Sequence, residues 1–192
     1  MNVYDFDGTI LHGDSEHYFL HYVYEMFPKL EKYRKRINRF KEKCLKGKKT
    51  REQFYNFKYK IILSRIDNLD LVVEQFWDEY DKHIKKWYLD IHLDDDIVIS
   101  ATPEFLLKPI MERLHIKTLI ASRMNMETFE IIGKLCYKED KVIRFKELFD
   151  INQIDNFYSD SETDKYMASV AKKAYFVKGN EILDWEIKKQ DL

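Results

Sequence analysis

The 192-residue chain has few cysteines and no long apolar run, and both absences narrow its class. Its two cysteines, Cys44 and Cys136, are far apart and lack the paired spacing of a zinc site or disulfide framework, which suits a reducing compartment. No stretch approaches about 18 consecutive apolar residues, so we expect no membrane-spanning helix. The chain begins with a strand-like segment instead of a basic and then apolar leader. We therefore expect no signal peptide and a cytoplasmic protein.

The composition is that of a packed globular protein. Hydrophobic residues make up 45% of the chain and aromatic residues 15%, which excludes an intrinsically disordered protein. The sequence contains no internal repeat and no low-complexity tract. A chain of 192 residues can form one core, or one core with a satellite subdomain.

Short apolar segments predict the sheet. Each is followed by polar or turn residues, as expected of parallel strands that are covered on both faces. The segments span residues 1–6, 96–101, 117–122, 154–158 and 174–177. Helical patterns at 104–114 and 140–149 separate later strands, so we predict an α/β fold with a doubly wound, mostly parallel, Rossmann-like sheet. Ligands of such sheets bind at the carboxyl ends of the strands.

A long segment without strands separates the first two strands. It predicts helices over 16–26, 30–45, 51–64 and 71–87. A connection of this length is an inserted subdomain and not a loop. We therefore predict an α/β core formed by residues 1–13 and 89–192, with an all-helical cap subdomain formed by residues 14–88.

Charge is unevenly distributed in this insert. Residues 29–60 are strongly basic and residues 67–81 are acidic. The basic residues are Lys29, Lys32, Arg34, Lys35, Arg36, Arg39, Lys41, Lys43, Lys46, Lys48, Lys49, Arg51, Lys58 and Lys60. One interpretation is that they form solvated helix faces that pair with the acidic stretch. Another is that they create a positive field that attracts anionic substrates. No nucleic-acid-binding module accompanies them, so no nucleic-acid partner is expected.

The first strand ends in an acidic turn whose side chains could act in catalysis. Asp5 and Asp7 are separated by one residue, and Gly8 and Thr9 follow. A carboxylate can attack a phosphoryl group when cations offset the repulsion between these two negatively charged groups. A second carboxylate can move the proton of the leaving oxygen, while Gly8 permits close approach of the backbone to a phosphate. The pattern predicts phosphoryl transfer through an aspartyl-phosphate.

Further polar residues follow the later strands. Ser100, at the end of the second strand, can donate a hydrogen bond to a phosphoryl oxygen. Lys141, at the start of a helix, can offset negative charge, although Lys138 is a competing candidate. Asp160 and Asp164 follow the fourth strand, and carboxylates in this position suit Mg²⁺.

With these parts in order, the sequence resembles the haloacid dehalogenase (HAD) superfamily, and within it the phosphoserine-phosphatase-like branch (subfamily IB). The resemblance covers residues 1–15 and about 96–180, and the insert matches the family's helical cap in position and length. It rests on Asp5-Phe6-Asp7-Gly8-Thr9-Ile10, on Ser100-Ala101-Thr102-Pro103-Glu104, on Gly133 with Cys136 and Lys141, and on Asp160-Ser161-Glu162-Thr163-Asp164.

The resemblance implies a magnesium-dependent phosphatase acting on a small phosphomonoester. Asp5 would be the nucleophile, and Asp7 the general acid and base. Asp5, Asp7 through its backbone carbonyl, and Asp160 would bind Mg²⁺, with Asp164 supporting the site. The residues implied in substrate binding are Gly8, Thr9, Ser100, Ala101, Lys141, Glu16 and Lys58.

Some positions depart from the family pattern. Ser159 and Thr163 stand where relatives commonly have glycine, and Lys58 stands near the place of an arginine that recognises the amino acid in phosphoserine phosphatases. The substrate is therefore not predicted to be phosphoserine. Two alternatives remain open: a phosphotransferase or phospholipid head-group phosphatase with the same chemistry, and a non-catalytic binding module. The sequence does not predict the oligomeric state.

Overall fold

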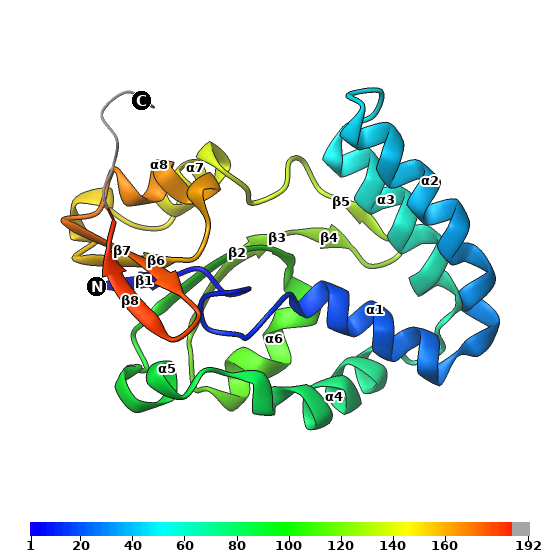
Figure 1. Ribbon diagram of the computed structural model, residues 1–192, viewed down its shortest axis with the longest axis horizontal. Coiled ribbons are helices and arrows are strands. Elements are labelled where there is room, and N and C mark those ends of the chain that lie inside the picture. Colours follow the sequence, from blue (N-terminus) through cyan, green and yellow to red (C-terminus); the bar gives the residue numbers. More distant parts are fainter. Residues whose placement is uncertain (186–192) are drawn as a thin grey trace.

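A six-stranded, mostly parallel sheet forms the centre of the computed structural model, which describes residues 1–185 (Figure 1). The strands are β1 (Asn2–Tyr4), β2 (Ile97–Pro103), β3 (Thr118–Ser122), β6 (Asn156–Ser159), β7 (Lys173–Lys178) and β8 (Glu181–Asp184). Their order is β3-β2-β1-β6-β7-β8, and only the β7–β8 pair is antiparallel. The fold class is as predicted, and each predicted strand segment contains or overlaps one of the parallel strands.

Strands β4 (Met124–Asn125), β5 (Glu130–Ile131) and β8 were not predicted. All four residues of β8 are exposed, so this edge strand lacks the apolar run by which the buried strands were identified. Strands β4 and β5 are only two residues long each and form a separate antiparallel hairpin.

Alternate residues of the inner strands face two separate cores. Val3, Ile97 and Phe157 pack on one side, where helices α7 (Glu139–Lys146) and α8 (Lys165–Ala168) cover the sheet. Tyr4 and Val98 face the other side, which helix α6 (Glu104–Arg113) covers. Both faces of the sheet are therefore buried, which explains why its strands are continuous apolar runs.

A stack of tyrosines crosses the sheet below the site. Tyr4, Tyr158 and Tyr175 are direct neighbours on β1, β6 and β7. Their rings are nearly parallel, with centroids 4.6 Å apart for Tyr4 and Tyr158 and 4.8 Å apart for Tyr158 and Tyr175. Such cross-strand aromatic pairs stabilise the pairing of β1 and β6, whose ends carry Asp5 and Asp160, and of β6 with β7.

Five helices lie between β1 and β2: α1 (Ser15–Met26), α2 (Arg34–Leu45), α3 (Arg51–Ile62), α4 (Leu69–Tyr80) and α5 (Lys86–Ile91). The prediction of one helix over 71–87 is wrong, because α4 ends at Tyr80 and a 3-10 turn follows. Ile84 is then extended and forms an isolated bridge with Leu11. This pairing brings Lys85 against the loop after β1, where its backbone N–H donates to the Ile10 carbonyl.

Helices α1–α3 and the β4–β5 hairpin lie at one end of the molecule, whereas α4 lies along α6 (Figure 1). The Trp77 indole of α4 donates a hydrogen bond of 2.6 Å to the Leu106 carbonyl of α6. The predicted domain boundaries, at residues 14 and 88, stay a prediction. Within the part of the chain that the structure describes, no helix is long and apolar enough to cross a membrane.

The acidic stretch of the insert does not pair with the basic stretch. Glu74, Asp78 and Asp81 instead surround Arg113 of α6, at 2.8, 2.9 and 3.7 Å. The expected pairing between the two stretches is therefore wrong, because these three carboxylates bind Arg113 instead.

Candidate active site

The predicted site residues meet at the carboxyl edge of the sheet. Asp5 directly follows β1, and its backbone N–H donates to the Tyr158 carbonyl of β6 at 2.9 Å. Ser100 lies in the neighbouring strand β2, and Asp160 directly follows β6. Parallel pairing of these strands brings segments from the start, middle and end of the chain together.

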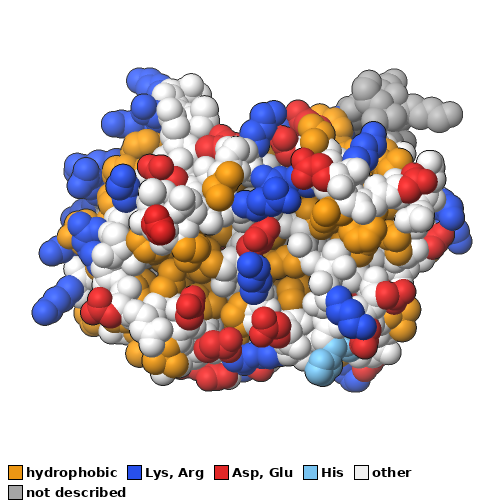
Figure 2. Space-filling model, turned by 180° about the vertical axis from the view of Figure 1, so that it is seen from behind, with side chains coloured by type: hydrophobic (Ala, Val, Ile, Leu, Met, Phe, Trp, Pro, Cys, Tyr) orange, Lys and Arg blue, Asp and Glu red, His pale blue; other side chains and the backbone are white. Residues whose placement is uncertain are grey.

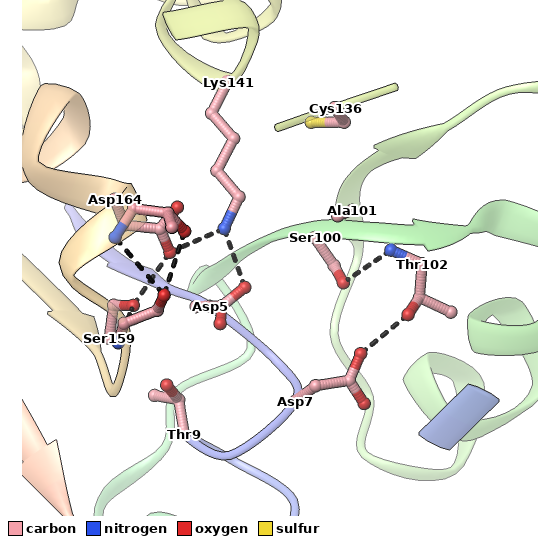
Figure 3. Close-up of polar contacts among 12 residues, drawn as sticks. Asp5, Asp7, Thr9, Ser100, Ala101, Thr102, Cys136, Lys141, Ser159 and Asp164 are labelled. Carbon is pink, nitrogen blue, oxygen red and sulfur yellow. Dashed lines mark hydrogen bonds and ion pairs between the residues drawn. The ribbon is translucent and has the colours of Figure 1, made fainter. Parts of the chain in front are cut away.

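Lys141 lies between two carboxylates. From the first turn of α7 its ammonium donates to Asp5 Oδ1 at 2.8 Å and to Asp164 Oδ2 at 2.7 Å (Figure 3). The Ser159 hydroxyl donates to the same Asp164 oxygen at 2.8 Å. Lys138, the competing candidate, instead places its ammonium over the Tyr137 ring. The structure thus assigns Lys141 to this cluster.

Burial and like charges control the protonation of this cluster. Burial raises the pKa of Asp5 and outweighs the lowering by Lys141, and the charges of Asp164 and Asp7 raise it further. Burial alone would lower the pKa of Lys141, but Asp164 and Asp5 raise it above its ordinary value, so its ammonium stays charged. With Asp5 and Asp164 both ionised, the cluster would hold two negative charges against the one positive charge of Lys141, so an additional cation would favour the ionised form of Asp5.

The Asp7 carboxylate points to the other side of the site. One oxygen accepts the Thr102 hydroxyl at 2.6 Å (Figure 3). The other accepts the Ser15 backbone N–H, at the start of α1, also at 2.6 Å. Burial and the charge of Asp14 raise the pKa of Asp7 to about 6, although the bonds from Ser15 and Thr102 lower it. A carboxyl with a pKa near neutrality is suited to general acid and base catalysis.

The turn after Asp7 packs against the loop after β6. Gly8 has φ of +74°, and a Cβ added there would lie 2.0 Å from Asp160 Oδ2, so only glycine fits. The Thr9 hydroxyl accepts the Asp160 backbone N–H at 2.9 Å and lies 3.3 Å from Asp160 Oδ1. Gly8 and Thr9 therefore position the Asp160 carboxylate beside the turn.

A second buried lysine, Lys85, binds the backbone of this turn. Lys85 is only 2% exposed, and its ammonium donates to the Gly8 carbonyl and, at 2.6 Å, to the Gly179 carbonyl. It is also close enough to Asp160 for that charge to act on its pKa, which burial lowers.

Ser100 and Ala101 form the β2 side of the site. Ser100 is 1% exposed, and its hydroxyl oxygen accepts the Thr102 backbone N–H at 3.1 Å. The hydroxyl proton of Ser100 is left available for a phosphoryl oxygen.

A cleft of about 1020 Å³ opens above these residues. Asp5, Asp7, Ser100, Lys141 and Asp160 line its floor, together with Gly8, Ala101 and Asp164. Thr9 does not line it and is fully buried.

The predicted cap residues Glu16 and Lys58 also line the cleft, but they bind each other. The Lys58 ammonium and the Tyr59 hydroxyl both donate to Glu16 Oε1. Lys58 is 2% exposed, so this ion pair is largely hidden from solvent.

The donor atoms fit the magnesium ion that the resemblance implies. Asp164 Oδ1 is buried and has no hydrogen-bond partner in the described part of the chain, and Asp5 and Asp160 offer further carboxylate oxygens. The Asp7 side chain is held by Ser15 and Thr102, which leaves its backbone carbonyl. Within residues 1–185 no three acidic, histidine or cysteine side chains already converge as a metal site. Carboxylate oxygens from these three aspartates and the Asp7 carbonyl suit Mg²⁺, which prefers oxygen ligands and keeps several of its waters.

Several residues of the site were assigned no role from the sequence. Thr102 and Ser15 bind Asp7, Ser159 binds Asp164, and Lys85 binds Gly8. Thr102 could have been suspected, because alternate residues of a strand share a face and Ser100 lies two positions earlier. Lys85 gave no such signal, since it was one of many lysines in a predicted helix.

A family model for haloacid dehalogenase-like hydrolases (HAD) matches residues 3–169. A search of curated proteins found no significant match.

Several solved structures are similar. A protein of unknown function from Bordetella pertussis Tohama I has 22% identity and a TM-score of 0.76, over 91% of this chain and 87% of that one. A phosphoserine phosphohydrolase-like protein from Francisella tularensis subsp. tularensis SCHU S4 has 16% identity and a TM-score of 0.57, over 90% and 84%. A phospho-aspartyl intermediate analogue of phosphoserine phosphatase has 13% identity and a TM-score of 0.50, over 90% and 83%.

At these identities the structural similarity shows the fold, which is that of phosphoserine-phosphatase-like phosphoric monoester hydrolases. The family match extends over most of the chain and includes the segments that carry Asp5, Ser100, Lys141 and Asp164. The chain therefore belongs to the haloacid dehalogenase-like hydrolases, and the prediction of an enzyme of this superfamily is confirmed.

Proposed function

We propose that the protein is a Mg²⁺-dependent phosphatase that hydrolyses a small phosphomonoester through an aspartyl-phosphate on Asp5. The observation that carries the proposal is the arrangement at the floor of the cleft. The Lys141 ammonium binds Asp5 and Asp164, and Asp7, with a pKa of about 6, is held on the opposite side. This supplies a nucleophile, a fixed cation and a proton donor in one cleft.

In the first step an Asp5 oxygen attacks phosphorus, and the bond between phosphorus and the ester oxygen breaks. Asp7 gives its proton to that leaving oxygen. Lys141 and the Ser100 hydroxyl donate hydrogen bonds to phosphoryl oxygens and balance the charge that develops there. Bound Mg²⁺ would supply further positive charge beside the phosphoryl group.

In the second step Asp7, now ionised, takes a proton from water. The water oxygen bonds to phosphorus, the bond between phosphorus and Asp5 breaks, and inorganic phosphate leaves. Asp5 is again a carboxylate and Asp7 is again protonated. Ser15 and Thr102 keep the Asp7 carboxylate in one orientation throughout.

The nucleophile is tested with Asp5→Asn in the full-length chain. We expect loss of Mg²⁺-dependent hydrolysis of p-nitrophenyl phosphate and of ³²P transfer to the protein. Asp95→Asn, a change of an exposed aspartate, should keep both activities and is the control. Retained activity in Asp5→Asn contradicts the proposal.

The role of Asp7 is tested by varying the leaving group. Asp7→Asn should slow release of an alkyl alcohol, which needs protonation, more than release of p-nitrophenolate, which does not. The comparison is made on the first turnover, before Asp7 acts as the base of the second step, and an equal loss on both substrates there contradicts the assignment of Asp7 as the acid. Phosphate transferred to added glycerol, in place of inorganic phosphate, would show a phosphotransferase.

A further inference from the structure

The wall of the cleft formed by α2 and the start of α3 is basic, in contrast to the acidic floor. Arg34, Lys41 and Arg51 line the cleft on this wall. Figure 2, which views the molecule from behind, shows Lys and Arg side chains gathered over the same end of the molecule.

These cations are hardly neutralised. Arg34 pairs at 3.2 Å with the exposed Glu31 one turn before it. Lys41 and Arg51 have no carboxylate partner anywhere in residues 1–185. The acidic helix of the insert, which could have paired with them, binds Arg113 instead. Free positive charge therefore faces the cleft.

Two of the three cations are held in place by aromatic rings. The Arg34 guanidinium lies 4.8 Å from the centroid of the Tyr24 ring, and the Arg51 guanidinium lies 4.2 Å from that of Tyr137. Both tyrosines also line the cleft. A guanidinium that stacks on a ring keeps its N–H groups free at its edge, where they can bind an anion in bidentate fashion.

The Glu16–Lys58 pair offers no such free charge. Three aromatic rings surround the Lys58 ammonium. Its Nζ lies 5.0, 4.1 and 4.7 Å from the ring centroids of Phe54, Tyr55 and Tyr59. Lys58 is satisfied by Glu16 and these rings, and Glu16 is satisfied by Lys58 and Tyr59. An amino-acid substrate would have to separate this buried pair before it could bind its own ammonium and carboxylate there, at a high cost.

We propose that the substrate carries a second anionic group, a phosphate or a carboxylate, which binds Lys41 and Arg51, near the turn that joins α2 to α3, while its phosphoester faces Asp5. This rests on the proposed phosphatase function and adds a substrate class to it. The cleft of about 1020 Å³ has room for a chain of several carbons between the two charges.

Three sugar phosphates of similar size test the proposal as inhibitors of p-nitrophenyl phosphate hydrolysis. Glucose 6-phosphate has an uncharged distal end, 6-phosphogluconate a distal carboxylate, and fructose 1,6-bisphosphate a distal phosphate. At least one of the two doubly anionic compounds should have an inhibition constant about tenfold below that of glucose 6-phosphate, as one charged hydrogen bond gives. The stronger of the two identifies the anion.

Variants locate the binding. In Lys41→Gln and Arg51→Gln the preference for the doubly anionic compounds should disappear, while the KM and kcat for p-nitrophenyl phosphate stay within about twofold, because the reporter has no second anion. Lys43→Gln, on the same helix but outside the cleft, should keep the preference.

Equal inhibition constants for the three compounds in the wild-type protein overturn the inference and leave the phosphatase proposal intact. A preference that Lys43→Gln reduces as much as Arg51→Gln overturns it also, because attraction would then come from the general charge of the helix. Absence of any p-nitrophenyl phosphate hydrolysis overturns the proposed function itself.

Discussion

Replacing Lys85 by methionine should destabilise the protein and disturb the active-site turn. The Lys85 ammonium is buried and donates to the carbonyls of Gly8 and Gly179. Methionine has a similar length but no donor, so both carbonyls lose their partner. Gly179 is exposed and its carbonyl can turn to water. The cost therefore arises mainly at Gly8.

The magnitude follows from that one bond. A hydrogen bond from a charged donor contributes about 1.5–3 kcal/mol. For a chain of this length each kcal/mol lowers the melting temperature by about 2–4 °C, so Lys85→Met should melt about 3–12 °C below the wild-type protein. Since Gly8 follows Asp7 directly, we also expect a lower kcat with p-nitrophenyl phosphate.

The assay is thermal unfolding followed by circular dichroism, with Lys86→Met as the matched control. The neighbouring Lys86 side chain is 86% exposed, and within residues 1–185 it pairs only with Asp90, at 2.9 Å, a contact worth about 0.3–0.5 kcal/mol. Lys85→Arg keeps the charge and the donors and should recover part of the loss. If Lys85→Met and Lys86→Met melt at the same temperature, the bond to Gly8 does not hold the turn.

Three further changes have defined outcomes. Gly8→Ala places a Cβ against Asp160 and should abolish activity, whereas Gly133→Ala, with nearly the same φ but no atom within 4 Å, should cost only about 1–2 kcal/mol of stability. Burial raises the pKa of Cys136 to about 12, so iodoacetamide at pH 8 should label this thiol only after unfolding. A lysine and the amino terminus lower the pKa of Asp155 to about 2. Asp155→Asn should therefore reduce stability above pH 4, and the difference should vanish as the pH falls towards 2 in acid unfolding curves.

The sheet and its acidic edge could be predicted because their signals are local. A strand buried on both faces is an apolar run, and the residue after it lies at the carboxyl edge of the sheet. Asp5 and Asp160 were therefore placed correctly next to β1 and β6 without knowledge of any contact. The exposed strand β8 has no such run, so nothing in its sequence distinguished it from a surface loop.

The choice between Lys138 and Lys141 shows where local signals end. Lys138 directly precedes α7 and Lys141 lies in its first turn, so from the sequence either side chain could have reached the strand ends. The structure separates them because Lys138 has a positive φ of 55° and turns to the Tyr137 ring, whereas Lys141 is directed at Asp5. Residue type and distance along the chain could not distinguish the two lysines, because the difference lies in their contacts in the folded protein.

The cap was the least predictable part because its chemistry depends on contacts between distant residues. Glu16 and Lys58 are 42 positions apart, and each is an ordinary helical residue in its own segment. Read singly, they were a carboxylate and a cation available to a substrate. Brought together, they neutralise each other, and the charge that remains free in the cleft belongs to Lys41 and Arg51. The substrate preference of this enzyme should accordingly follow the unpaired cations Lys41 of α2 and Arg51 of α3 and not the mutually bound Glu16 and Lys58.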